Sequence, residues 1–140
     1  MRSASPRSTL SLRRVGLLAA LLAVSFLVDG CEHEHEEGKP SGATCPTTQT
    51  LTYANFGMAF FAQYCTRCHS ESVTGAARNG APADHNFDTV ADIVFNKDHI
   101  DEHAAAGPTV VNEEMPPTAP KPTEADRKKL GEWLACGAPM

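Results

Sequence analysis

Apolar residues recur at helical spacing between residues 51 and 64. The aromatic side chains of this run stand four residues apart, at Phe56, Phe60 and Tyr64. Thr52, at the start of the run, is a residue type that caps helix N-termini. Gly57 lies in the middle, where glycine disfavours a helix by about 1 kcal/mol relative to alanine. We therefore predict a helix over 51–64 with a close neighbour at Gly57.

Three further helices are predicted later in the chain. One begins near Asp88 or Thr89, and a second covers residues 98–106. The last begins at the N-cap residue Thr123 and ends at Gly137. Their buried faces are predicted to contain Val90, Ile93 and Val94 in the first and Leu130, Trp133 and Leu134 in the last.

The segments between these helices have the composition of loops. Residues 70–86 are polar and rich in glycine and proline, and residues 109–122 contain four prolines, which a regular helix does not accommodate. No stretch requires a strand. The sequence thus predicts an all-α domain over residues 45–140, with three to four helices joined by long loops.

The first 44 residues are not expected to belong to this domain. Residues 1–30 combine four arginines with an uncharged apolar run at 15–28, which is short for a membrane span and typical of a signal peptide. Cys31 follows a small residue after this run, as at a bacterial lipoprotein cleavage site, so we expect its thiol to be acylated. Ordinary cleavage near Gly30 is the alternative. Residues 31–44 are acidic and lack an apolar period, which indicates a tether.

The chain is acidic, with a formal net charge of −5. Removal of residues 1–30 would take away four arginines and Asp29, which leaves 8 basic and 16 acidic residues and a net charge of −8. Such a surface repels nucleic acid and favours a protein partner that presents a basic patch. We therefore expect no nucleic-acid partner.

Residues 65–69, Cys-Thr-Arg-Cys-His, form the C-x-x-C-H signature of covalent haem attachment. Cys65 and Cys68 at a helix end can each bond one vinyl group of a haem, and His69 then lies under the ring as an iron ligand. A thioredoxin-like redox pair is the first alternative, but no βαβ pattern surrounds the motif. Half of a zinc site is the second, but no other C-x-x-C or paired-histidine spacing follows. A disulfide between the two cysteines is the third alternative.

A haem iron bound only by His69 would keep one open face, and six residues are candidates for its second axial ligand. They are Met58, Met115, Met140, His85, His99 and His103. Met115 is favoured because it stands 46 residues after His69 on a loop stiffened by Pro116 and Pro117. A thioether there would favour Fe(II) and raise the reduction potential.

The stretch from about Tyr53 to Pro139 resembles a class I, mono-haem cytochrome c. Gly57, Phe61 and Cys65 stand at the family's four-residue intervals. Leu130 and Trp133 match the pair on its last helix that crosses the first helix at the glycine, and Met115 precedes that helix as the family's distal methionine does. The resemblance implies one covalent haem c in a cytochrome c fold. It also implies that a proline carbonyl, here that of Pro82, accepts the Nδ1 proton of His69.

Five cysteines are present, and two are expected on haem and one on lipid. The remaining two, Cys45 and Cys136, flank the terminal helices. We expect them to be joined in an oxidising compartment, with two free thiols as the alternative.

An iron bound by His69 and Met115 has no vacant site for a substrate. The sequence therefore predicts a monomeric one-electron carrier rather than an enzyme. It is expected to be exported to the periplasm, held at a bacterial membrane by lipid on Cys31, and to exchange electrons with redox proteins. A peroxidase-like haem enzyme, or a gas or redox sensor, is the alternative if the distal site is open or displaceable.

Overall fold

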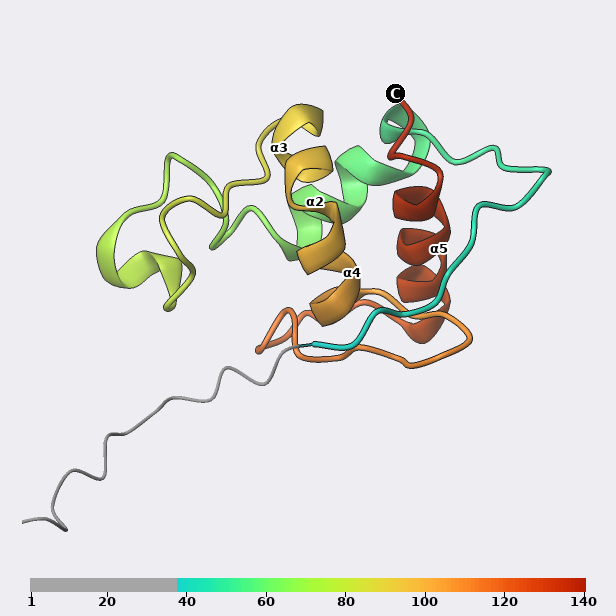
Figure 1. Cartoon of the computed structure of the whole chain (residues 1–140). Coiled ribbons are helices and arrows are strands. Elements are labelled where there is room, and N and C mark those ends of the chain that lie inside the picture. The colour runs from blue at the N-terminus through green and yellow to red at the C-terminus, as the bar shows by residue number, and fades with distance from the viewer. Residues whose placement is uncertain (1–37) are drawn as a thin grey trace, which may run out of the picture. The chain divides into compact units, whose positions relative to one another are not determined.

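The computed structural model describes residues 38–140, and this part of the chain is built from short helices joined by long loops (Figure 1). Their bounds are η1 Tyr53–Gly57 (a π-helix), α2 Met58–Tyr64, η2 Gly75–Arg78 (a 3₁₀-helix), α3 Val90–Phe95, α4 Lys97–Ala104 and α5 Glu124–Ala135. Residues 38–140 contain no strand, only an isolated bridge between Ala106 and Val111. The predicted all-α class is confirmed.

The first helical segment begins where a local capping signal predicts it. The Thr52 hydroxyl accepts a hydrogen bond from the Asn55 backbone N–H at 3.2 Å, and the Asn55 side chain accepts one from the Thr52 backbone N–H at 2.7 Å. This reciprocal pair satisfies N–H groups that a helix start leaves unpaired. The segment opens with the π-helical turn η1 and continues as α2, so the predicted helix over 51–64 is present with an irregular first turn.

The last helix, α5, packs against this segment at a glycine. A Cβ atom on Gly57 would lie 3.0 Å from two ring carbons of Trp133 and 2.9 Å from the Tyr53 ring. Trp133 is fully buried, and its indole N–H donates to the Pro139 carbonyl at 3.2 Å. Gly57 thus has the close neighbour that the sequence predicted.

The core lies between these helices. Its most deeply buried large side chains include Phe61, Ile93, Leu130 and Trp133. The prediction for α3 was partly wrong: Ile93 is buried, but Val94 is 39% exposed. A six-residue helix makes fewer than two turns, so it presents only a narrow face to the core.

The helix predicted over 98–106 ends two residues early, at Ala104. Ala105 adopts an extended conformation, and the Ala106 N–H donates to the Arg127 carbonyl at 3.0 Å. Both alanines are buried where α4 meets α5, and these two helices lie side by side in Figure 1. The helix therefore ends at Ala104, because Ala106 bonds to the backbone of α5 and not to its own helix.

Residues before the predicted domain boundary at Cys45 already contact the domain. Ser41 is fully buried, and its N–H and hydroxyl donate to the Asp101 carboxylate on α4 at 2.8 and 2.6 Å. The Lys39 carbonyl accepts from the Asn112 side chain at 2.8 Å. Residues 38–43 are thus attached to the domain, which corrects the end of the expected tether. The expected signal peptide, the Cys31 lipid site and the rest of the tether lie outside the described residues.

Cys45 and Cys136 form the expected disulfide, with their Cα atoms 4.7 Å apart and 91 positions apart in sequence. The bond ties the segment before η1 to the end of α5. Among residues 38–140, no helix is both long and apolar enough to cross a bilayer.

Candidate haem-binding site

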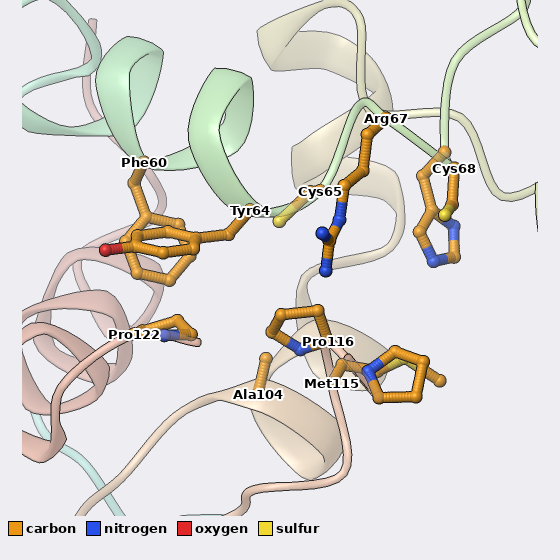
Figure 2. Close-up of a pocket in the computed structure, with 11 residues that line it drawn as sticks. Phe60, Tyr64, Cys65, Arg67, Cys68, Ala104, Met115, Pro116 and Pro122 are labelled. Carbon is orange, nitrogen blue, oxygen red and sulfur yellow. The ribbon is translucent and has the colours of Figure 1, made fainter. Parts of the chain in front are cut away.

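The C-x-x-C-H motif and Met115 line one cavity. The space between its walls, including the part that opens to solvent, amounts to about 370 Å³. In Figure 2, Cys65 and Cys68 lie on one side of it, and Ala104, Met115 and Pro116 face them from the other. The remaining lining residues are mostly apolar: Phe60, Tyr64, Arg67, His69, Pro117 and Pro122. The end of α2 and the proline-rich loop thus form opposite walls.

The motif begins where α2 ends. Cys65 is the C-cap of α2, and its carbonyl accepts from the Cys68 N–H at 3.1 Å and from the His69 N–H at 3.0 Å. This turn brings both cysteines and the histidine to the same wall. Neither Cys65 nor Cys68 is in a disulfide, although the other pair of the domain is. Burial raises the pKa of the Cys65 thiol to about 12, which keeps it protonated at neutral pH.

His69 is held in one orientation. Its Nδ1 lies 2.9 Å from the His85 carbonyl oxygen, and its ring stacks on Phe87 with centroids 4.6 Å apart. A carbonyl can only accept, so Nδ1 carries the proton and Nε2 keeps a free lone pair, as a metal ligand requires. Burial lowers the pKa of His69 despite this hydrogen bond, which also favours the neutral ring.

The expectation that Pro82 would accept the Nδ1 proton was wrong. The Pro82 carbonyl instead accepts from Arg78, a buried residue whose guanidinium also donates to the Ser70 carbonyl at 2.7 Å. Arg78 also donates to the His85 carbonyl, at 3.3 Å, so this one carbonyl accepts from both Arg78 and His69. The His85 carbonyl thus accepts the Nδ1 proton of His69, which the sequence analysis assigned to the Pro82 carbonyl.

Of the six candidates for the second axial ligand, only Met115 lines the cavity. Met58 and Met140 are 54% and 76% exposed elsewhere, and none of the three candidate histidines is among the lining residues. Both backbone polar groups of Met115 are bound: its N–H donates to the His103 carbonyl at 2.9 Å, and its carbonyl accepts from Arg127 at 2.8 Å. The structure therefore brings together His69 and the methionine that the sequence favoured.

Arg67, inside the motif, has a role that the sequence analysis missed. Its guanidinium donates to the Thr118 carbonyl at 2.6 Å and to the Ala119 carbonyl at 2.8 Å. The motif is thus tied directly to the loop that carries Met115. A basic residue at a variable position of C-x-x-C-H gives no sign of this contact, because its acceptors are main-chain groups about 50 residues away.

These features fit a covalent haem. Two unpaired thiols, a histidine with Nε2 free and a thioether surround one largely apolar cavity. Thiols can form thioethers with haem vinyl groups, and His and Met are both established haem ligands. Cys65 and Cys68 would hold such a group, with His69 and Met115 on its two faces.

Residues 54–134, more than half of the chain, match the model of a protein family described as cytochrome c oxidase, cbb3-type, subunit III. The chain belongs to this cytochrome c family. The matched region includes the C-x-x-C-H motif, Met115 and nearly all of α5. No curated protein and no solved structure matches the chain. The expected cytochrome c domain is confirmed, and with it binding of c-type haem and haem-based electron transfer.

Proposed function

We propose that this cytochrome c domain is a one-electron carrier with a single haem c. The haem would be bound through Cys65 and Cys68, with His69 and Met115 as axial ligands. The observation that carries the proposal is that Met115, alone among six candidates, lines the same cavity as His69 and the two thiols. Ligation on both faces leaves no position for a substrate, so the alternatives of a haem enzyme and a sensor are disfavoured.

The protein groups around the haem would support electron transfer in three ways: they orient His69, exclude water and keep the ligands rigid. Bound haem supplies the reversible gain and loss of one electron. The His85 carbonyl fixes the tautomer of His69 and increases its basicity. The apolar walls exclude water, and rigid ligands keep the geometry similar in both oxidation states. Together these properties lower the reorganisation energy of electron transfer.

We further propose that the protein is exported and anchored to a bacterial membrane through lipid on Cys31. The leader-like residues 1–30 and the Cys45–Cys136 disulfide support an oxidising compartment such as the periplasm. The net charge of −8 expected for residues 31–140 supports redox partners with a basic docking patch.

The axial ligation can be tested by two spectra of the haem-loaded protein. Ferric protein with bound methionine shows a weak sulfur-to-iron charge-transfer band in the far red, and ferrous protein with both axial positions filled does not bind carbon monoxide. Met115→Ala should abolish the band, lower the reduction potential and allow carbon monoxide to bind. Met58→Ala is the matched control, because Met58 lies on α2 outside the cavity and should leave both spectra unchanged.

Two outcomes would contradict the proposal. A wild-type protein that lacks the band and binds carbon monoxide rapidly would favour an enzyme or a sensor. A band that persists in Met115→Ala would show that another residue is the ligand.

A further inference from the structure

Arg127 is a buried cation that forms no ion pair among the described residues, although the carboxylate of Glu113 is close enough to act on its charge. Its residue is 1% exposed, and the ion pairs found among residues 38–140 do not include it. Burial lowers the pKa of its guanidinium, but an arginine keeps its charge at neutral pH. Burial of a charge costs several kcal/mol unless hydrogen bonds compensate for the lost water. The hydrogen bonds that compensate for this cost show which parts of the fold Arg127 holds together.

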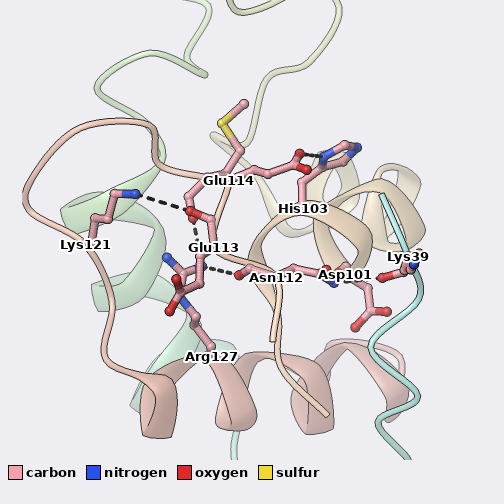
Figure 3. A network of polar contacts seen from close by, with 9 residues as sticks. Lys39, Asp101, His103, Asn112, Glu113, Glu114, Lys121 and Arg127 are labelled. Carbon is pink, nitrogen blue, oxygen red and sulfur yellow. Dashed lines mark hydrogen bonds and ion pairs between the residues drawn. The ribbon is translucent and has the colours of Figure 1, made fainter. Parts of the chain in front are cut away.

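Three main-chain carbonyls surround one nitrogen of the guanidinium. Nη1 of Arg127 lies 2.7 Å from the carbonyl oxygens of Ala104 and Asn112 and 2.8 Å from that of Met115. Nη1 has two hydrogens, so at least one of them is shared between two acceptors. Figure 3 shows Arg127 reaching from α5 towards Asn112. One side chain thus joins α5, the end of α4 and the loop that carries Met115.

Other charged groups also contact this loop: Arg67 donates to the Thr118 and Ala119 carbonyls, and the Glu114 carboxylate lies 2.6 Å from Nδ1 of His103. Residues 109–122 include four prolines, each without an N–H, and Pro116 directly follows Met115. The Met115 peptide is bound by α4 through the His103 carbonyl and by α5 through Arg127. The Asn112 side chain adds a second anchor by donating to the Lys39 and Asp101 carbonyls, both at 2.8 Å (Figure 3). Of the two contacts to the Met115 peptide itself, only that of Arg127 involves a charge.

We propose that Arg127 is the positioning residue that holds Met115 on the distal side of the haem. The inference rests on the proposed function, because it takes Met115 as the axial ligand. Hydrogen bonds from a charged donor are about twice as strong as those between neutral groups. They keep the Met115 backbone in place, and the thioether stays within reach of the iron. Without Arg127, the loop moves and the sixth coordination position opens.

The test compares haem-loaded Arg127→Lys with Leu130→Ala. Lysine keeps the charge but lacks the planar fork and the length to reach the same three carbonyls. Leu130 lies on the same helix, is fully buried and makes no hydrogen bond to the Met115 loop, so its truncation lowers stability alone. Three quantities are followed in urea: the ferric charge-transfer band, the rate of carbon monoxide binding to ferrous protein, and helix content.

We expect Arg127→Lys to lose the band at a urea concentration at which its helices are still folded. It should also bind carbon monoxide about tenfold faster than Leu130→Ala, as loss of one charge-assisted hydrogen bond implies. Leu130→Ala should lose the band only when it unfolds. Equal rates in the two variants, with the band following unfolding in both, would overturn the proposal and leave Arg127 a purely structural residue.

Two further measurements keep the result interpretable. If Arg127→Lys does not accumulate as folded protein, Asn112→Ser removes the second anchor and should shift the same signals in the same direction. No shift in that variant would count against the proposal. A wild-type protein without the band, by contrast, would reject Met115 as the ligand, which is a failure of the proposed function.

Discussion

The ring of Trp133 lies directly against the backbone of Gly57. A Cβ atom at Gly57 would come within 3.0 Å of two carbons of that ring, a distance that real Cβ atoms essentially never undercut. The contact joins α5 to the turn before α2, which leads into the haem-binding motif. It therefore determines where the motif lies relative to α5, which carries Arg127.

Gly57→Ala should destabilise the domain by about 1–3 kcal/mol, because the added methyl group overpacks the contact with Trp133. Urea unfolding followed by far-ultraviolet circular dichroism measures the change. Ala62→Gly, at an exposed position of α2, is the control and should cost about 1 kcal/mol through helix propensity alone. If Gly57→Ala stabilised the protein by a similar amount, the close contact would not matter.

The disulfide should contribute strongly to stability. Cys45→Ala with Cys136→Ala should lower the free energy of unfolding by about 4 kcal/mol, on the chain-entropy estimate for a loop of this length. The variant should keep the visible spectrum of the wild type, because neither cysteine lines the haem cavity. A stability equal to that of the wild type would show that the bond does not constrain the unfolded chain as expected.

His99 should make stability depend on pH. Its ring centroid lies 4.6 Å from that of His85 and 4.3 Å from that of His103. Burial lowers the pKa of His99 below 6.5, the neighbouring imidazoles of His103, His85 and His69 lower it further, and the Glu114 carboxylate opposes the shift. The unfolded chain then binds the proton more readily, so stability is complete above pH 6.5 and decreases as the pH falls towards the folded pKa.

His99→Gln should therefore lose less stability than the wild type between about pH 7 and about pH 5. The difference should be below about 1 kcal/mol, because the exposed side chain is partly screened by solvent. Urea unfolding at both pH values measures it. Parallel losses in the two proteins would exclude His99 as the group responsible.

The sequence predicted those features that depend on neighbouring residues. Thr52, Thr89 and Thr123 each accept from the backbone N–H three residues later, so three helix starts could be placed from local signals. The C-x-x-C-H motif is equally local. Met115 was favoured as a ligand because a methionine on a proline-rich loop, unlike one at helical spacing, has little use in a helical core.

Features that depend on distant polar contacts could not be predicted. Ser41 binds Asp101, 60 positions away, without an apolar pattern to mark the contact, so the domain boundary was placed too late. The Pro82 expectation failed because the Pro82 carbonyl accepts from Arg78 and the His85 carbonyl accepts from His69. Arg127 stands among the charged residues of α5, where the sequence gives no sign that it is buried.

The proposed function requires that haem be bonded to the thiols of Cys65 and Cys68. The intact mass of the protein, measured under denaturing conditions after expression with haem-maturation machinery, tests it most directly. The wild-type polypeptide should carry the mass of one haem, and a variant with both cysteines changed to alanine should lack that mass. A wild-type polypeptide with no added haem mass would show that the two thiols do not bond haem.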